Sequence, residues 1–367
     1  MSADSSVESI ILIDKREIPE ASPISLRRKR DNAAVLDFTI PARTLAGLRD
    51  VEKHFRQGSL VELYLGIGTG AQRVFYGLLP SLLSDRNLRE SGNELQLTAH
   101  DFIGQLESRT LELGDSTSSY LDPEGQEIGG LVASMVQTVI NSQFDTSLVD
   151  FSIQGIEGTD PARIVSSEEA KRGVDTIKKH IDTYTALAYD DTTYPDAPLL
   201  YEYHQRDNYF VWRKEKETDT PPALRLVLGK DAILSGEIQR QPLYTDAYAT
   251  GIGTARWTHS DRDSSRRWGG RRFWNRLSVD SSDVGDAYNA AVRTVELFKH
   301  ERITFSLLCA RDAYCLHPGD IIALENADAQ GIPSAHQRVS EVRIRFSPTI
   351  RTEITVGDVP RTLTDYL

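Results

Sequence analysis

The chain has 367 residues, of which 39% are apolar and 26% charged, and its formal net charge is −12. This length and composition are typical of a globular protein of two or three domains. The excess of acid argues against a general nucleic-acid or membrane-surface binder, because such a protein needs a basic surface. No apolar run approaches the roughly 18 residues of a membrane span, and the polar start, Met1–Ser6, does not resemble a signal peptide.

The first third of the chain is predicted to form a β domain. Its apolar residues alternate with polar ones, and this period of two indicates strands with one buried face. A helix is expected over 42–55, because apolar residues recur there every three or four positions, and a short helix over 102–107. Four adjacent cations, Arg27 to Arg30, could bind phosphate, but we favour a solvated loop. The strands are expected at 7–13, 34–41, 60–67, 73–85 and 94–101.

An α/β insert is expected next. A wide apolar stripe predicts a helix from Ile128 to Ile140. A second helix is expected from about Ser167 to Tyr189, because Ser166 and Glu169 fit a capping box. Further strands are expected at 151–158, 199–205, 208–215, 223–229 and 233–240.

The composition changes after residue 243. Seven arginines fall between Arg256 and Arg276, and three of the four tryptophans lie among them. Arginine beside aromatic residues can stack on single-stranded nucleic acid or a glycan, but both types are also enriched at protein interfaces. Because the whole chain is acidic, we favour a protein interface. A capped helix is expected to follow Ser282. The candidate interface anchors are Trp257, Arg266, Arg267, Trp268, Arg271, Arg272 and Trp274.

The last sixty or so residues are predicted to form a second β domain. The sequence Gly319-Asp320-Ile321 opens a strand as Gly58-Ser59-Leu60 does, and a long strand and a closing strand follow in both places. We interpret this as an internal duplication, although any two β meanders can share such a pattern. Cys309 falls within a strand, which favours a buried free thiol over a disulfide. The strands are expected at 302–310, 321–326, 337–347 and 350–357.

We find no motif for catalysis, for a cofactor or for a metal. The stretch 66–70, Gly-Ile-Gly-Thr-Gly, lacks the Lys-Ser/Thr of a phosphate-binding loop and the spacing of a dinucleotide site. The eight histidines are scattered, and neither Cys-x-x-Cys nor His-Glu-x-x-His occurs. A carboxylate pair for glycoside hydrolysis depends on spatial separation. The nearest candidates, Asp190-Asp191 and Asp280 with Asp283, are better explained as a solvated loop and a helix cap.

Several stretches in this order resemble the hub proteins of phage tail baseplates, of the late-control-D-like and Mu-type families. No single one is specific, but their order along most of the chain is. The stretches are RVFYGLLPSLLSD and NELQLTAHDFIGQLESR, LDPEGQEIGGLVASMVQTVI, VDTIKKHIDTYTALA with LLYEYHQRDNYFVWR, ILSGEIQRQPLYTDAYATGIG, SSRRWGGRR, and LHPGDIIAL with RVSEVRIRFSPTIRTEITV.

The resemblance implies an α+β, mainly β fold with two similar barrels related to the tail-tube fold, an α-containing insert and a small inserted subdomain. We expect the first barrel at 1–112, the insert at 113–197, the second barrel at 198–243 plus 303–360, and the subdomain at 244–302. It also implies a homotrimer without catalytic residues or cofactor, which joins a sixfold tail tube to a threefold spike.

The expected partners are a tail tube or distal tail protein above, a spike or tip protein below, and the tape measure and other baseplate proteins. DNA would pass through the lumen, and no stable membrane insertion is expected. The protein would be assembled in the host cytoplasm and reside at the virion tail tip. Three alternatives stay open: the hub of a contractile injection system, a tail-tip hydrolase of cell-wall glycan, and a module that binds glycan or single-stranded nucleic acid.

Overall fold

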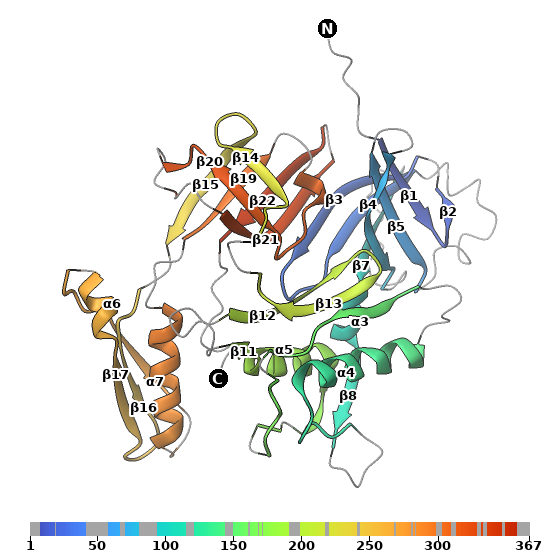
Figure 1. Cartoon of the computed structure of the whole chain (residues 1–367). Helices are drawn as coiled ribbons and strands as arrows, with labels where there is room; N and C mark the ends of the chain where they lie inside the picture. The colour runs from blue at the N-terminus through green and yellow to red at the C-terminus, as the bar shows by residue number, and fades with distance from the viewer. Residues whose placement is uncertain are drawn as a thin grey trace.

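The molecule is mainly β and consists of two barrels side by side, an α/β insert below them and a separate small subdomain (Figure 1). It is described here from a computed structural model. In the described part, no helix is long and apolar enough to cross a membrane. The helix expected over 42–55 lies outside the described residues. These are 8–18, 20–41, 58–66, 70–80, 94–114, 121–143, 150–160, 162–167, 169–170, 172–190, 199–216, 220–240, 243–267, 269–279, 282, 284–298, 303–309, 313–328, 332, 336–346 and 349–357.

The first barrel forms where apolar residues alternate along the chain. In β4 (Val35–Pro41), Leu36, Phe38 and Ile40 are fully buried. Strand β1 contacts β3 and thereby curls the sheet on itself. Helix α3 (Phe102–Ser108) begins directly after the last strand and is capped by Asp101. The other strands are β1 (Glu8–Ile13), β2 (Arg16–Glu17), β3 (Ser22–Lys29), β5 (Leu60–Gly66), β6 (Gln72–Leu78) and β7 (Glu94–Asp101).

The second barrel repeats the first. The first runs β3-β4-β7-β6-β5-β1 across its sheet, and the second runs β15-β19-β22-β21-β20-β14. Each strand thus occupies the place of its counterpart, in the same chain order. All these pairs are antiparallel except β14 with β20, which is parallel where β1 with β5 is antiparallel. The strands are β14 (Leu224–Val227), β15 (Ala232–Arg240), β19 (Ile303–Cys309), β20 (Ile321–Glu325), β21 (His336–Arg345) and β22 (Arg351–Val356), with a 3-10 turn, η2 (Ala313–Cys315), before β20.

The two barrels share one continuous sheet. Strand β21 pairs with β22 of its own barrel and also with β3 of the other, from Glu341 opposite Lys29 to Arg345 opposite Ser25. Buried residues of both barrels, such as Phe38 and Ile354, form one hydrophobic cluster. Cys309 belongs to it and is free, as predicted. Burial of apolar surface therefore holds the barrels together along with the strand pairing.

The insert has its own core. The aromatic rings of Tyr201 and Trp212 stack there with centroids 4.5 Å apart, in one buried cluster with residues of α4 and α5. Strands β12 and β13, which the predicted boundary at residue 198 assigns to the second barrel, pair here with β11 and β9. The elements are β8 (Thr110–Leu113), α4 (Ile128–Gln143), β9 (Ser152–Ile156), β10 (Gly173–Thr176), α5 (Ile177–Leu187), β11 (Tyr189–Asp190), β12 (Leu199–Arg206) and β13 (Tyr209–Lys214).

The predicted start of the second insert helix is wrong. Ser166 and Glu169 do exchange capping-box hydrogen bonds, but they close only a turn. Gly173, with φ of +125°, then leads into strand β10, and the helix begins after Thr176, whose hydroxyl accepts from the Lys179 N–H. The local cap was correctly recognised, but pairing of β10 with β8 decides the conformation that follows.

The small subdomain is a three-stranded sheet covered on one face by a helix. Ala247, Ala249 and Leu277 of the sheet pack against Ala287 and Val295 of α7. The strand order in this sheet is β17-β16-β18. The alanines at the contact let the helix pack closely against the sheet. The elements are β16 (Asp246–Thr250), β17 (Arg256–Ser260), α6 (Arg262–Arg267), β18 (Trp274–Ser278) and α7 (Val284–Phe298).

The solvated loop predicted for Arg27 to Arg30 is also wrong. Strand β3 extends through Lys29, and Arg28 and Arg30 are each only 5% exposed, on the same side as Leu26. Their polar partners come from residues far away in the sequence, such as Glu215 and the backbone of Leu316. From the sequence alone, a run of cations is expected to be exposed to solvent, because burying a charge is costly unless the fold supplies a partner.

Candidate functional site

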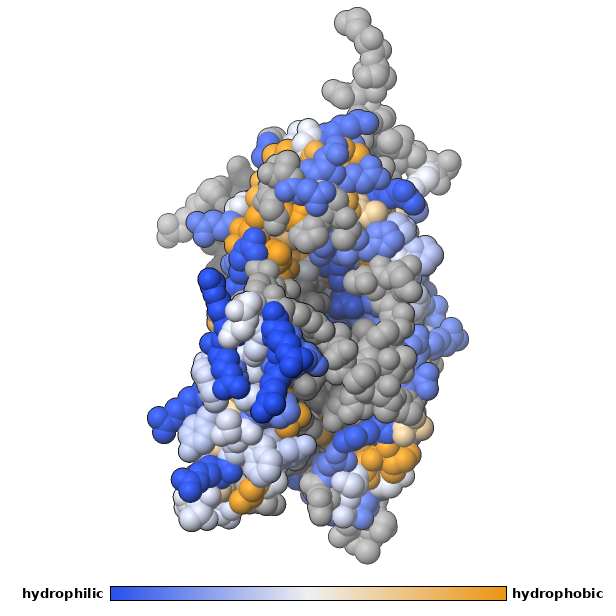
Figure 2. Space-filling view, turned by 60° about the vertical axis from the view of Figure 1, so that its left-hand side comes forward, coloured by the Kyte–Doolittle hydropathy of each residue, from blue (hydrophilic) through white to orange (hydrophobic). Residues whose placement is uncertain are grey.

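The subdomain presents a cationic and aromatic face to the outside. Helix α7 covers the face of the sheet nearer the rest of the molecule, so the other face points outward (Figure 1). Strand register places Tyr248 between Thr258 and Arg276 on that outer face. Arg256 is exposed on the same face, and Trp274 is 51% exposed. With this side turned forward, the surface there is mostly hydrophilic or of intermediate hydropathy (Figure 2).

The structure brings some predicted interface anchors together and separates others. Arg272 lies 6.0 Å from the Trp274 ring and 3.8 Å from the buried carboxylate of Asp246. Trp257 lies on the helix side of the sheet, where it meets Tyr288 edge to face with ring centroids 5.1 Å apart.

The remaining anchors differ in their surroundings. The exposed Arg266 pairs with Asp263 in its own short helix at 3.1 Å. Arg271 is exposed. The side chain of Arg267 and all of Trp268 lie outside the described part. Within the described part, Arg256, Arg271 and Arg276 make no ion pair, so this outward surface carries uncompensated positive charge on an acidic protein.

A second polar feature is buried where both barrels meet the insert. Arg30, directly after β3, donates to Glu215 at 2.6 Å, and Arg338 of β21 lies 3.2 Å from the same carboxylate. Glu202 of β12 is fully buried, between Arg30 at 3.8 Å and Arg213 at 3.7 Å. Burial raises the pKa of Glu202, and the neighbouring arginines oppose that shift. These ion pairs join the three modules, and no sequence motif indicated them.

Two histidines lie in the same region. The rings of His204 and His317 are 6.4 Å apart, and burial, together with nearby arginines such as Arg28 and Arg213, holds the pKa of both well below the ordinary value. Neither ring nitrogen of His204 has a hydrogen-bond partner in the described part. Both rings are therefore neutral at physiological pH, among fixed positive charges.

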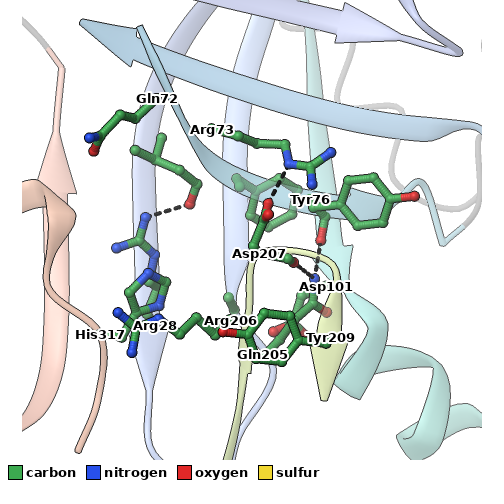
Figure 3. A pocket seen from close by; sticks show the side chains of 13 residues that line it. Arg28, Gln72, Arg73, Tyr76, Asp101, Gln205, Arg206, Asp207, Tyr209 and His317 are labelled. Carbon is green, nitrogen blue, oxygen red and sulfur yellow. Dashed lines mark hydrogen bonds and ion pairs between the residues drawn. The ribbon is translucent and has the colours of Figure 1, made fainter. Parts of the chain in front are cut away.

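A cavity of about 320 Å³ opens beside this junction. It is lined from β3, β6, the β12–β13 hairpin and the turn before β20 (Figure 3). Arg73 pairs with Asp207 across it, and Gln205 donates to the Tyr76 carbonyl at 2.7 Å. Burial raises the pKa of Asp101, another lining residue, to about 7. Sequence reasoning missed the cavity because its lining residues are dispersed from position 28 to position 317.

The arrangement offers binding rather than evident chemistry. In the part of the chain that the structure covers, no group of three or more His, Cys, Asp or Glu side chains could hold a metal ion. Asp101, whose pKa burial raises to about 7, caps α3 by accepting from the Ile103 N–H at 3.0 Å. The described residues instead provide two polar surfaces that could bind a partner, the outward face of the subdomain and the cavity at the junction.

We found no family model and no curated protein that matches the sequence. Solved structures do match. A tail protein from Neisseria meningitidis MC58 aligns with a TM-score of 0.61 at 11% identity, over 98% of this chain and 99% of that one. The 43 kDa tail protein of prophage MuSo2 from Shewanella oneidensis aligns with a TM-score of 0.59 at 10% identity, over 96% and 98%. A chain of the Francisella PdpA–VgrG complex aligns with a TM-score of 0.54 at 10% identity, over 97% of this chain and 60% of that one.

The chain therefore has the fold of phage tail proteins. The predicted resemblance and the predicted mainly β fold with two similar barrels are both confirmed at the level of the fold. In particular, it corresponds over nearly its whole length to the Neisseria and Shewanella tail proteins.

Proposed function

We propose that this protein is a structural hub of a tailed virus, a homotrimer that joins a sixfold tail tube to a threefold central spike or tip. The observation that carries this proposal is the repeated barrel. Two barrels of the same strand order lie edge to edge in one chain, so three chains supply six similar units. A trimer of such chains can match sixfold symmetry on one side and threefold symmetry on the other.

The pairing within the chain suggests how copies associate. Edge strand β3 of the first barrel adds to β21 of the second. Strand β15 is the counterpart of β3, and among the described strands only β19 pairs with it. Strand β6 is the counterpart of β21. An exposed strand edge readily accepts another strand, so β15 of one copy would add to the first barrel of the next copy, as β3 adds to the second barrel within the chain, and close a ring.

The proposed partners follow from this geometry. A tube or distal tail protein would bind the sixfold side and a spike or tip protein the threefold side, at the virion tail tip, with DNA passing through the ring. Tape measure and other baseplate proteins would complete the assembly, which would form in the host cytoplasm. The fold of a chain in the PdpA–VgrG complex supports the injection-system hub as the second candidate. The outward arginines and Trp274 would serve as docking anchors.

We infer no enzymatic role, because the proposal needs only shape and strand pairing. A glycan hydrolase would require a placed carboxylate pair, and a module for glycan or single-stranded nucleic acid would require stacking on the outward face. Incubation with purified cell wall and titration with single-stranded DNA test these alternatives directly. Turnover that is lost on neutralising one carboxylate would favour the hydrolase, and salt-dependent saturation would favour the binding module.

The oligomeric state tests the hub. Light scattering of the purified chain should give three times the 41.0 kDa chain mass, and addition of a tail tube protein should give that mass plus the mass of the bound tube protein. Ile233 of β15 is 55% exposed, and Ile233→Lys should reduce the trimer to monomers. Val174→Lys, at a residue of the insert that is 66% exposed, should leave it intact. A chain that stays monomeric under both conditions would contradict the proposal.

A further inference from the structure

Arg28 is a buried cation that forms no ion pair among the described residues, although the charge of Asp320 acts on it from a longer distance. Its guanidinium donates to the carbonyl oxygens of Tyr314 at 3.0 Å, of Leu316 at 2.8 Å and of Val74. Among the described residues, no carboxylate pairs with it, and two of its five N–H groups have no partner. A buried charge is costly unless an opposite charge accompanies it. Burial accordingly lowers the pKa of Arg28 to about 10.

Arg30 provides a comparison within the same segment. It follows Arg28 by two positions, on the same side of the backbone, and is equally buried at 5% exposure. Arg30, however, is paired with Glu215 at 2.6 Å and lies 3.8 Å from Glu202. The fold therefore supplies carboxylates to one of the two buried arginines and only carbonyl oxygens to the other. What distinguishes Arg28 is that it lines the cavity of about 320 Å³ (Figure 3).

The cavity carries further positive charge. Arg206 also lines it, and its one ion pair among the described residues is a long one, 3.9 Å to Asp320. The Nδ1 atom of His317, another lining residue, is buried and has no partner in the described part. These three side chains come from β3, β12 and the turn before β20, and Figure 3 shows them on the same side of the cavity. An anion placed there could receive hydrogen bonds from all three.

The acidic lining residues do not cancel this charge. Asp207 is held by Arg73, which also donates to Glu62 at 2.8 Å, so these carboxylates already have a cation. Asp101 is only partly ionised near neutrality, because burial raises its pKa to about 7. Arg28 and Arg206 are therefore the charges left without full compensation.

We propose that the cavity at the junction of the two barrels and the insert binds one anionic group, a carboxylate or a phosphate, with Arg28 as its principal ligand and Arg206 and His317 as supporting donors. The group can arrive as a free ion or as an acidic side chain of a bound protein. The volume accommodates either. This site does not depend on the trimer proposed above.

Titration calorimetry of the full chain at constant ionic strength tests the site, with inorganic phosphate and an oligoglutamate peptide as probes. Arg28→Met should weaken saturable binding at least about tenfold, because charge-assisted hydrogen bonds are the strongest in proteins. Arg206→Gln, a milder change at a residue whose side chain is 40% exposed, should weaken it less. Arg225→Gln, at an exposed position outside the cavity lining, should leave it unchanged. Phosphate binding would indicate a free ion, and Arg28-dependent binding of the peptide alone would indicate a partner side chain.

Thermal unfolding gives a second measurement. Without added anion, the melting point of each protein serves as its own baseline, because Arg28→Met removes a buried charge but also leaves the carbonyl oxygens of Tyr314, Leu316 and Val74 without their donor. With saturating phosphate or peptide, only the native chain should gain stability. If neither probe gives Arg28-dependent saturation, or if the probes stabilise both proteins equally, the carbonyl oxygens satisfy Arg28 and the proposal is wrong.

Discussion

Replacing Gly319 with alanine should destabilise the protein far more than a glycine in a similar backbone conformation elsewhere. Gly319 has φ of +82°, and a Cβ atom there would lie 2.0 Å from Oε1 of the fully buried Glu202. Gly229 has φ of +88°, and nothing lies within 4 Å of its Cβ position. The left-handed backbone alone costs an alanine about 1–2 kcal/mol. Gly229→Ala should therefore lower the free energy of unfolding by only that amount.

Gly319→Ala adds a second cost. Glu202 must leave its place between Arg30 and Arg213, and disrupting a buried ion pair costs about 3–5 kcal/mol. We expect a total of about 4–7 kcal/mol, measured as the shift in urea unfolding followed by circular dichroism. In a Glu202→Ala background the clash is gone, so the cost of Gly319→Ala should fall to about 1–2 kcal/mol. Equal effects of the two glycine substitutions in the native background would refute the reasoning.

Three further predictions concern single groups. Burial raises the pKa of Asp101 from the ordinary 3.8 to about 7, so its contribution to stability is full below about pH 4 and is lost as the pH rises to 7. Asp101→Asn should therefore reduce the dependence of the melting temperature on pH between about pH 4 and 7. An unchanged pH dependence would contradict this. Thr185→Val should cost about 1–3 kcal/mol in urea unfolding, because the buried indole N–H of Trp212 loses its acceptor at 2.9 Å; no loss would mean that the indole finds another. Maleimide should label the exposed Cys315 in the folded protein but not Cys309, whose thiol is buried with a pKa of about 12; labelling of both would show that the core opens.

Much of the barrel architecture could be predicted because alternation is a local property. The strand expected at 350–357 occurs as Arg351–Val356, in which every second residue is buried, and the apolar run expected at 321–326 occurs as Ile321–Glu325, in which the first four residues are all buried. The similar order of such strands in the two halves of the chain also indicated that the barrel is repeated. The strand expected over 73–85 occurs as Gln72–Leu78, and its predicted remainder falls mostly outside the described residues.

The buried polar junction could not be predicted, because its partners are far apart in the sequence. Arg28 and Arg30 were interpreted as solvated, and nothing near them indicates Glu215 or the Leu316 carbonyl as partners. The cavity could not be predicted for the same reason, because its lining residues are also far apart in the sequence. Interface anchors were recognised as a class from composition, but assigning Trp274 to the outer face and Trp257 to the helix side required the register of three strands.

The continuous sheet also has a mechanical consequence. The paired segments from Lys29 to Ser25 and from Glu341 to Arg345 run antiparallel. A force that pulls the barrels apart along these strands loads the whole ladder in shear, so its hydrogen bonds must break together. A force across the strands would open them one after another, like a zipper. The linkage between the barrels should thus be stiff in one direction and compliant in the other, and single-molecule pulling from different attachment points can measure that anisotropy.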